Sequence, residues 1–487
     1  MRYIQGQNRY QAKLLPDVLD DYILEDNPAR IIDAFVDSLD LKSFGFSKTE
    51  MTATGRPAYS PYDLLKLYIY GYFNKVRSSR KLEKETQRNV EVMWLLGKLR
   101  PDHKTISRFR KENLAPLKKV FDAFVKLCLK MNLYSRQLIS IDGSHFSAVN
   151  AKDRNYSTNK LKDRISHINN HISRHLAEME TNDINEVEEV RSKKIADIVA
   201  SLKARKEKYT DMLEQLETTG ETQISLTDPD SRLLVKLNSR KVVYNVQTAV
   251  DGNNAMVVDY EVINTNDRGQ MHSLALKCKE VLEVDKLVSI ADKGYIAATD
   301  IAKCISDGIV ANVPLDEGSL SFCIETDQDY EMPETYENGR IVYLKNRNIC
   351  VCPMGQVLYP SSYRKRTRKV RFMNGKACAG CKQKCTSARY GIGEVSIKKA
   401  DFSKLYNVEG LKLKPIHYVP DVQLLKKRKS LSEHPFGVIK RGLGADYFLL
   451  KRFSGVTAEM ALIFLVFNMK RAINILGTEK ILTEIRA

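Results

Sequence analysis

Two short apolar segments of the chain predict buried strands, and each of them ends at an aspartate. Residues 138–142 are Leu-Ile-Ser-Ile-Asp, and residues 287–292 are Leu-Val-Ser-Ile-Ala-Asp. Short runs rich in β-branched residues are typical of interior strands. Because open α/β sheets present their chemistry at the carboxyl ends of strands, the pattern makes Asp142 and Asp292 candidate site residues.

The region between these strands predicts a β-hairpin. Apolar residues alternate over 242–250 and 255–263, and Asp251-Gly252-Asn253-Asn254 between them is a strong turn sequence. Asp251 is therefore interpreted as structural. Asp142 also precedes a glycine, so a turn is its alternative interpretation, but no returning strand follows within hairpin distance. The remaining predicted elements are helices over 272–284 and 297–306 and a strand over 308–314.

Helical patterns dominate residues 1–135. Ser60 and Pro61 predict a helix start, since serine is a favoured cap and proline is favoured at the first helical position. Asp102 predicts the cap of a second helix, in which Lys104, Arg108 and Lys111 share one face. This face is either a DNA-contacting surface or the solvated side of an amphipathic helix.

A long helical hairpin is predicted after the first strand. Apolar positions recur at alternating gaps of four and three residues in two arms, which is typical of an antiparallel helix pair. The predicted seam consists of Leu161, Ile165, Ile168, Ile172, His175 and Met179 in one arm and Ile195, Ile198, Leu202, Arg205, Tyr209, Met212 and Leu216 in the other.

The predicted order is strand, helical hairpin, two-stranded hairpin, helix, strand, helix and strand. This is the order of the ribonuclease-H-like fold, in which the first and fourth strands lie side by side. The fold class is therefore α/β, a ribonuclease-H-like mixed sheet with an inserted helical hairpin and a Cys-rich insertion, preceded by an all-α domain. The predicted divisions are 1–135 for the helical domain, 136–314 for the first part of the core with the hairpin at 158–220, 315–400 for the Cys-rich basic insertion, and 401–487 for the C-terminal helical part of the core.

The charge balance indicates a polyanionic partner. The 487 residues include 78 Lys and Arg against 60 Asp and Glu, a net charge of +18. The excess is concentrated at Arg364–Arg371 and Lys426–Lys429, which favours nucleic acid binding over mere solubility. A basic membrane-surface patch is the alternative, but no lipidation motif or membrane helix accompanies it, so no membrane partner is expected.

The chain is expected to be cytoplasmic, with reduced cysteines. Its start, Met1–Gln7, lacks the apolar core of a signal peptide. Five of the nine cysteines cluster, at Cys350, Cys352, Cys378, Cys381 and Cys385. Four thiolates bind zinc tetrahedrally, and the favoured ligands of a structural zinc ion are Cys352, Cys378, Cys381 and Cys385. Free thiols and an iron–sulfur cluster are the alternatives.

A third carboxylate, Glu433, follows far downstream. Ser432 suits a helix cap and Pro435 suits the first turn, so Glu433 is predicted at a helix start. A first-turn glutamate favoured by the helix dipole is the alternative interpretation. Three carboxylates can hold two divalent cations roughly 3.5–4 Å apart, which clamps the entering and leaving oxygens of a phosphate. In a basic chain this arrangement predicts phosphoryl transfer on nucleic acid.

The chain resembles the DDE transposases of bacterial insertion sequences over nearly its whole length. The motifs that carry the resemblance are Gly55–Tyr59, Pro101–Arg110, Ile141–Ser144, Thr227–Arg232, Ala291–Tyr295 and Glu433–Lys440. The resemblance implies that Asp142 and Asp292 share two Mg²⁺ ions, or Mn²⁺ in their place, and that Glu433 completes the shell of the second ion. Lys440 follows Glu433 by seven residues on the same helix face and would contact the phosphate near the cleaved end.

One motif departs from a related group of these enzymes. That group places a tyrosine seven residues and an arginine four residues before the glutamate, where this chain has Lys426 and Lys429. Arg428 is one residue out of register, so phosphate binding is the role we prefer for it. The other predicted DNA contacts are Lys104, Arg108, Arg366 and Arg368.

The resemblance implies a transposase that binds the ends of its own element, cleaves DNA by metal-dependent hydrolysis and joins the 3′ ends to target DNA. Double-stranded DNA is the implied partner, with a homodimer or larger assembly forming on it. Two alternatives remain open. One is a transposase-derived DNA-binding protein without catalysis, which would lack one of the three acids. The other is a ribonuclease-H-like nuclease that cuts without joining.

Overall fold

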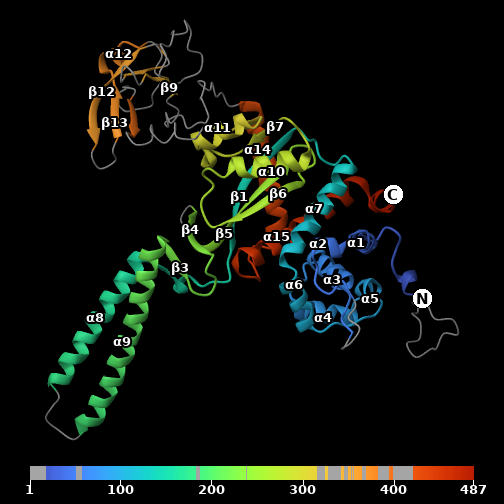
Figure 1. The fold of residues 1–487 in the computed structure, drawn as a ribbon, viewed down its shortest axis with the longest axis horizontal. Helices are drawn as coiled ribbons and strands as arrows, with labels where there is room; N and C mark the ends of the chain where they lie inside the picture. The colour runs from blue at the N-terminus through green and yellow to red at the C-terminus, as the bar shows by residue number, and fades with distance from the viewer. Residues whose placement is uncertain are drawn as a thin grey trace, which may run out of the picture.

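A computed structural model gives the architecture. It describes residues 18–50, 57–181, 187–236, 239–314, 324–326, 342–344, 349–352, 354, 356–364, 369–381, 394–398 and 421–487. The chain has a mixed α/β fold built around one mixed sheet, with helices on both sides and before it (Figure 1).

The central sheet has the order β4-β5-β1-β7-β8, and β6 also pairs with β5. β1 runs antiparallel to β5 and parallel to β7, and β8 continues the parallel pairing beyond β7. The predicted first and fourth strands therefore lie side by side. The strands are β1 (Leu138–Ser147), β4 (Arg232–Lys236), β5 (Ser239–Asp251), β6 (Val257–Ile263), β7 (Leu287–Ile290) and β8 (Ile309–Asn312).

The structure extends the predicted first strand. β1 does not end at Asp142 but continues to Ser147, because β5 is long enough to pair with it as far as the Ser147–Val243 pair. The polar residues after Asp142 concealed this extension in the sequence. β4, which pairs with the start of β5, was not predicted at all.

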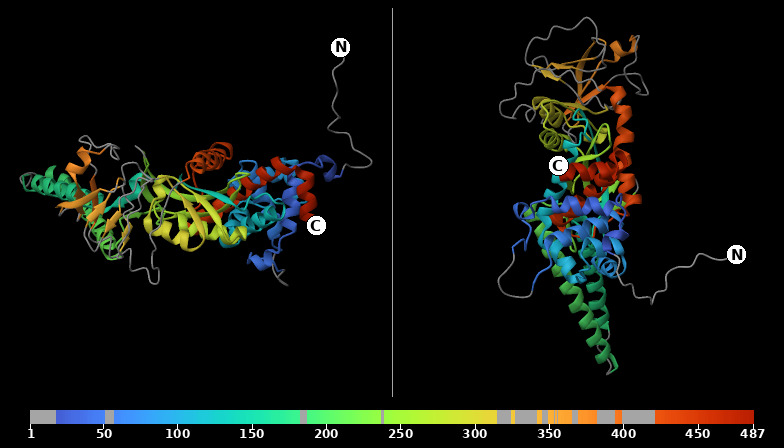
Figure 2. Two further views of the ribbon diagram at one scale, coloured as in Figure 1. Left: turned by 90° about the horizontal axis from the view of Figure 1, so that it is seen from above. Right: turned by 90° about the vertical axis from the view of Figure 1, so that its right-hand side faces the viewer.

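Two helices follow the strands on one side of the sheet, and a late helix covers the other. α10 (Met271–Leu282) and α11 (Ala298–Ser306) pack together, and α10 contacts β1, β5, β6 and β7. α14 (Val422–Gly437) contacts β1, β5 and β7. Seen from above, α14 and α10 lie on opposite sides of the strands (Figure 2).

The N-terminal helices form as their caps predict. Ser60 accepts a hydrogen bond from the Tyr62 amide at 3.1 Å, and Asp102 accepts one from the Thr105 amide at 2.6 Å. The helices are η1 (Leu19–Tyr22), α1 (Pro28–Asp37), α2 (Leu41–Phe44), α3 (Pro61–Phe73), α4 (Ser79–Arg88), α5 (Val90–Leu95), α6 (His103–Glu112) and α7 (Leu114–Lys130).

One helix near the C-terminus joins the N-terminal helices to the sheet. α15 (Arg452–Leu476) contacts α3 and α7 on one side and β6 on the other, and α16 (Thr478–Arg486) contacts α1. A continuous hydrophobic core runs from Ala29 through the sheet to Leu482. Asn468 of α15 bonds both the amide and the carbonyl of Val257 at 2.8 Å. No single described helix is long and apolar enough to cross a membrane; only α15 and α16 taken together, with a 109° bend, reach that length and composition.

A buried ion pair also connects the N-terminal helices to α15. Arg77, between α3 and α4, donates to Glu459 of α15 at 2.8 Å and to the carbonyls of Gly444 and Tyr447. The second oxygen of Glu459 accepts from the amides of Leu449 and Leu450. Glu459 is fully buried, so its charge depends on these partners.

The Thr227–Arg232 segment has a structural role. Asp228 accepts from the Arg452 amide at 2.9 Å and from the Tyr244 hydroxyl at 2.7 Å, and Asp230 accepts from the Phe453 amide at 2.8 Å. Two carboxylates that lie far before α15 in the sequence thus accept hydrogen bonds from its first amides. The helix dipole favours negative charge at this end of a helix.

The predicted helical hairpin is present and extends away from the sheet (Figure 1). It consists of α8 (Thr158–Thr181) and α9 (Val187–Thr219), which pack against each other, with η2 (Lys152–Arg154), β2 (Asn155–Ser157) and β3 (Gln223–Ser225) at its base. Two of the described seam positions are wrong: Ile198 is 45% exposed, with Val199 buried instead, and Arg205 is exposed.

A second sheet forms in the region predicted as the Cys-rich insertion. Its order is β14-β13-β12-β11-β10-β9. The described elements are β9 (Ile324–Thr326), β10 (Val342–Leu344), β11 (Ile349–Val351), β12 (Val357–Arg364), β13 (Lys369–Met373), α12 (Gly375–Ala379) and β14 (Glu394–Lys398).

Candidate active site

The strand register brings the two candidate aspartates to neighbouring positions. Ser140 of β1 pairs with Ile290 of β7, and Asp142 and Asp292 each lie two residues beyond that pair. The Asp142 carboxylate accepts from the Gly143 amide at 2.9 Å, and that of Asp292 accepts from the Gly294 amide at 2.8 Å. The second contact caps the short helix η3 (Lys293–Tyr295). Both aspartates are half-buried.

A buried tyrosine lies beside these carboxylates. The Tyr295 hydroxyl donates to Gln247 of β5. Burial raises the pKa of Tyr295 well above its usual value, and the negative charges of Asp267, Asp142 and Asp292 raise it further. The negative charges of three aspartates therefore act on this hydroxyl. Asp267 was not predicted, because it lies in a loop without strand or helix periodicity.

The helix that carries the third acid differs from the prediction. α14 starts after Asp421, which caps it by accepting from the amides of Gln423 and Leu424, so Glu433 lies well inside the helix. Ser432 is not a cap, since its hydroxyl donates to the Arg428 carbonyl. Pro435 lies within the helix, and the next turns widen into the π-helical η4 (Val438–Gly442). Because a proline has no amide hydrogen, Pro435 cannot donate to the carbonyl of Leu431 four residues earlier.

Contacts of α14 show which part of the sheet it faces. The ring centroids of Phe436 and Phe146 are 6.2 Å apart, and Phe146 shares a face of β1 with Asp142 because side chains alternate along a strand. Lys440 donates to the Ser144 hydroxyl and the His145 carbonyl, both at 2.7 Å, and lies over the Phe146 ring. Lys440 therefore lies within two residues of Asp142 along β1.

The predicted metal ligands are carboxylates, whose oxygen atoms suit a divalent cation. Half-buried carboxylates on neighbouring strands are hard oxygen donors of the kind that Mg²⁺ prefers. Glu433 is exposed on α14, one turn before Phe436. Among the residues that the structure describes, no three His, Cys, Asp or Glu side chains lie close enough together to hold a metal ion. Convergence of Asp142, Asp292 and Glu433 on one site stays a prediction.

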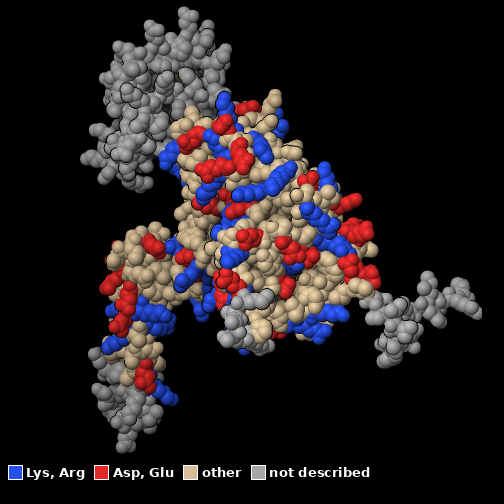
Figure 3. Space-filling view, turned by 45° about the vertical axis from the view of Figure 1, so that its right-hand side comes forward, with Lys and Arg blue, Asp and Glu red and all other residues tan. Residues whose placement is uncertain are grey.

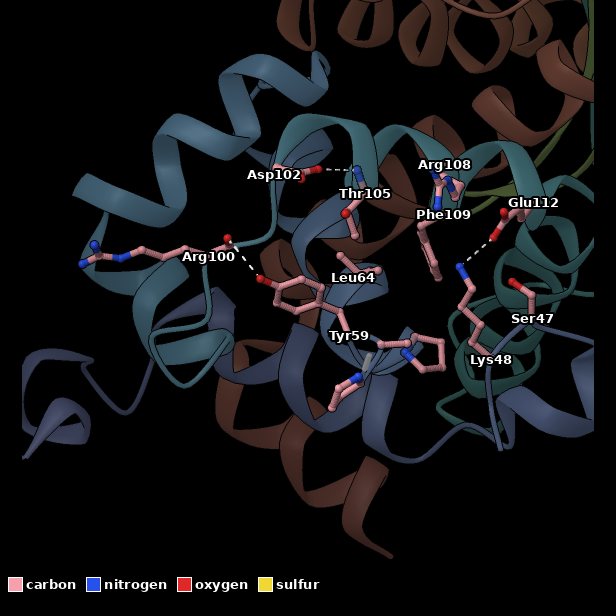
Figure 4. A pocket seen from close by; sticks show the side chains of 13 residues that line it. Ser47, Lys48, Tyr59, Leu64, Arg100, Asp102, Thr105, Arg108, Phe109 and Glu112 are labelled. Carbon is pink, nitrogen blue, oxygen red and sulfur yellow. Dashed lines mark hydrogen bonds and ion pairs between the residues drawn. The ribbon is translucent and has the colours of Figure 1, made fainter. Parts of the chain in front are cut away.

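The predicted DNA contacts lie on separate parts of the molecule. Lys104 and Arg108 are exposed on α6, and Arg428 is half-buried on α14. Arg108 and Arg100 line a pocket of about 450 Å³ beside Tyr59 (Figure 4). On the face in Figure 3, basic and acidic side chains are interspersed over the body. Arg366 and Arg368 lie outside the described residues.

The cysteine cluster is described in part. Cys352 is buried, and its sulfur accepts from the Gln356 amide at 3.3 Å. Cys378 is in α12, and Cys381 follows that helix; both are half-buried. Cys385 lies outside the described residues, so zinc binding by the four predicted ligands stays a prediction.

Comparison with known families identifies the chain. Residues 17–112 match a family model described as a transposase domain (DUF772), and residues 351–473 match one described as a transposase DDE domain. The chain belongs to the DDE transposases. The second match contains Glu433 and Lys440 of this transposase, and the first contains the helices up to α6.

The other comparisons add little. No curated protein matches the transposase significantly. A cryo-EM structure of a piggyBac transposase synaptic complex with hairpin DNA aligns with 94% of this chain and 79% of its own, at 9% identity and a TM-score of 0.31. A likeness of that size does not establish a shared fold.

Proposed function

We propose that this transposase cleaves DNA at the ends of its own insertion element and joins the 3′ ends to target DNA at one divalent-metal site. The observation that carries the proposal is the parallel β1–β7 register, in which Ser140 pairs with Ile290 and each aspartate follows that pair by two residues. The α14 contacts support Glu433 and Lys440 as the remaining members, because the helix packs on the face of β1 that bears Asp142.

Each side chain has a definite part in this proposal. Asp142 and Asp292 would hold two Mg²⁺ ions, or Mn²⁺, and Glu433 would complete the coordination shell of the second ion. When bound, such ions stabilise phosphate charge and activate water or a 3′-hydroxyl. Lys440 is held over β1 by Ser144 and would place its ammonium against the phosphate at the cleaved end.

The strand order supports a ribonuclease-H-like core. The sequence β6-β5-β1-β7-β8 places the third, second, first, fourth and fifth core strands in the order expected from the sequence. The alternatives are a transposase descendant without catalysis and a nuclease that does not join. We propose that the enzyme acts in the bacterial cytoplasm as a homodimer or larger assembly on double-stranded DNA, since two ends must be joined.

A strand-transfer assay tests the proposal. Full-length protein, a DNA carrying one element end and a supercoiled target are incubated with Mg²⁺. Joined products support a transposase, while cleavage without joining supports the nuclease. End binding without cleavage supports the silent DNA-binding protein.

We predict that α6 contributes phosphate contacts. Replacing both Lys104 and Arg108 by alanine should reduce the slope of log affinity against log salt by about two units, since each lost phosphate contact removes about 0.9. Binding to end DNA is measured by fluorescence anisotropy from low to high salt. Lys130→Ala, an exposed change at the end of α7, is the matched control. An unchanged slope in the double variant would mean that Lys104 and Arg108 do not contact DNA phosphates.

We also predict one structural zinc ion per chain, bound by Cys352, Cys378, Cys381 and Cys385. Elemental analysis of purified protein should find about one equivalent of zinc, because four thiolates complete a tetrahedral site. Cys381→Ser should lose it, whereas Cys350→Ser, which changes the fifth clustered thiol, should retain it. Protein without zinc, or zinc that survives Cys381→Ser, would contradict this ligand set.

A further inference from the structure

The base of the helical hairpin is anchored to the body of the protein. Nζ of Lys160 donates to the carbonyl of Asn155 at 2.7 Å and lies 4.7 Å from the centre of the Tyr156 ring. Leu161 and Leu216 are buried between the two helices, and β2 pairs with β3, which contacts β4 of the central sheet (Figure 1). Side chains on the first turns of α8 and the last turns of α9 are therefore presented from an ordered base.

Two arginines from different helices project from this base. Arg164 of α8 and Arg205 of α9 are both exposed, and neither forms an ion pair within the part of the chain that the structure describes. At separations of three and four residues, where side chains share a helix face, neither arginine has an acidic neighbour. The nearest acids in sequence, Asp163 and Glu207, are one and two residues away and point to other sides of the helices. The two guanidinium charges are therefore not neutralised along either helix.

A pair of tyrosines shows that both arginines act on the same place. The ring centroids of Tyr156 and Tyr209 are 5.5 Å apart. Burial raises the pKa of Tyr209, but its interaction with Tyr156 and the positive charges of Arg205 and Arg164 bring that pKa below its usual value. Burial raises the pKa of Tyr156 above its usual value, against the charges of the same two arginines. Arg164 and Arg205 therefore both lie near this tyrosine pair.

Two exposed guanidinium groups without acidic neighbours suit a phosphate. The planar donors of arginine match phosphate oxygens, and the chain carries a net charge of +18. The hairpin also follows the strand that bears Asp142. From Asp142 to Ser147, β1 advances about 17 Å at roughly 3.4 Å per residue, and η2 and β2 come next in the chain. One turn of duplex DNA spans about 34 Å, so a duplex whose end lies at Asp142 is long enough to reach the hairpin base.

We propose that Arg164 and Arg205 bind backbone phosphates of the DNA duplex whose end is cleaved, which makes the hairpin base a DNA contact separate from α6. This inference rests on the proposed function, because that function supplies DNA as the partner. Phosphate contacts carry no direct sequence information, so the hairpin base contributes affinity and orientation rather than recognition of the element end. If these arginines were only a solvated surface, replacing them would leave DNA binding unchanged.

Salt-dependent DNA binding tests the site. The full-length protein is titrated onto a labelled duplex several helical turns long, in EDTA so that no metal-dependent cleavage occurs, and anisotropy gives the affinity at each salt concentration. The double variant Arg164→Ala/Arg205→Ala should lower the slope of log affinity against log salt by about two units, since each lost phosphate contact removes about 0.9. Alanine is the strongest helix former, so both helices should persist, and circular dichroism checks this.

Matched variants separate a phosphate site from a mere change of net charge. Arg174→Ala/Lys194→Ala removes the same charge from exposed positions nearer the tip of the hairpin and should keep the wild-type slope. Arg164→Lys/Arg205→Lys keeps the charge at the site and should also keep that slope. An equal fall in the Arg174/Lys194 variant, or an unchanged slope in the Arg164/Arg205 alanine variant, overturns the inference.

Two further results keep the outcome clear. Arg205→Ala alone should lower the slope by about one unit, which tests the inference if the double variant loses helical structure. If the arginines contact a second copy of the chain instead, the double variant lowers the oligomeric state in sedimentation without DNA and leaves the slope unchanged, which overturns the inference. A lowered slope in a protein that fails the strand-transfer assay would keep this site and reject the proposed function.

Discussion

The Asp292→Asn protein should bind element-end DNA with nearly wild-type affinity and cleave it at least about 10³-fold more slowly. The amide cannot supply the negative charge that a divalent ion needs, and such an ion contributes several kcal/mol to stabilising the charge of the transition state. A loss of about 4 kcal/mol corresponds to roughly 10³ in rate. The asparagine oxygen can still accept from the Gly294 amide, so the local turn should persist.

Single-turnover cleavage of a labelled end, with anisotropy for binding, provides the measurement. Asp285→Asn serves as the control, because it removes an exposed carboxylate near the same strand and should cleave normally. A variant of Asp292 that retained cleavage within tenfold of wild type would remove this residue from the metal site. Loss of DNA binding in the same variant would indicate a folding defect instead.

Replacing Arg77 by alanine should destabilise the protein by about 3–5 kcal/mol. The change leaves the fully buried carboxylate of Glu459 without its cation, and breaking a buried pair by removing one partner typically has that cost. It also leaves the carbonyls of Gly444 and Tyr447 without their donor. The N-terminal helices would then lose their polar link to α15.

Urea unfolding followed by tryptophan fluorescence measures this effect, since Trp94 in α5 is the single tryptophan. Arg80→Ala changes an exposed arginine three residues away and should alter stability by no more than about 0.5 kcal/mol. Equal midpoints for the Arg77 and Arg80 variants would mean that the buried pair contributes no net stability. Glu459→Gln should destabilise less than Arg77→Ala, because the Arg77 guanidinium keeps the carbonyls of Gly444 and Tyr447 and gains the glutamine oxygen as acceptors.

The sequence was most informative where structure depends on local pattern. The caps at Ser60 and Asp102 and the turn at Asp251 act within three residues of themselves, and each was found. The start of α14 was missed because Ser432 and Pro435 resemble a helix start, while the true cap, Asp421, lies eleven residues earlier. The continuation of β1 past Asp142 depends on pairing with β5, which no local pattern reveals.

In the candidate site, too, residues placed by local pattern could be identified, whereas contacts between distant segments could not. Asp142 and Asp292 could be identified from the strands that carry them, and their neighbouring positions follow from the pairing of β1 with β7. The contact of Asp267 with the sheet could not be identified, because its partners Asn245 and Gln247 lie on another strand. Asp228 and Asp230 were part of a recognised motif, but their bonds to the start of α15 cross more than 220 residues.

The position of α15 has a consequence for synthesis of the protein on the ribosome. The N-terminal helices and the sheet both bury apolar side chains against α15, which is translated after both of them. The nascent chain therefore cannot complete its core until α15 has left the exit tunnel, and domains made earlier normally fold first. A premature stop codon before residue 452 should leave the two earlier regions unfolded and open to proteolysis, so that a truncated chain does not persist as a competing DNA binder.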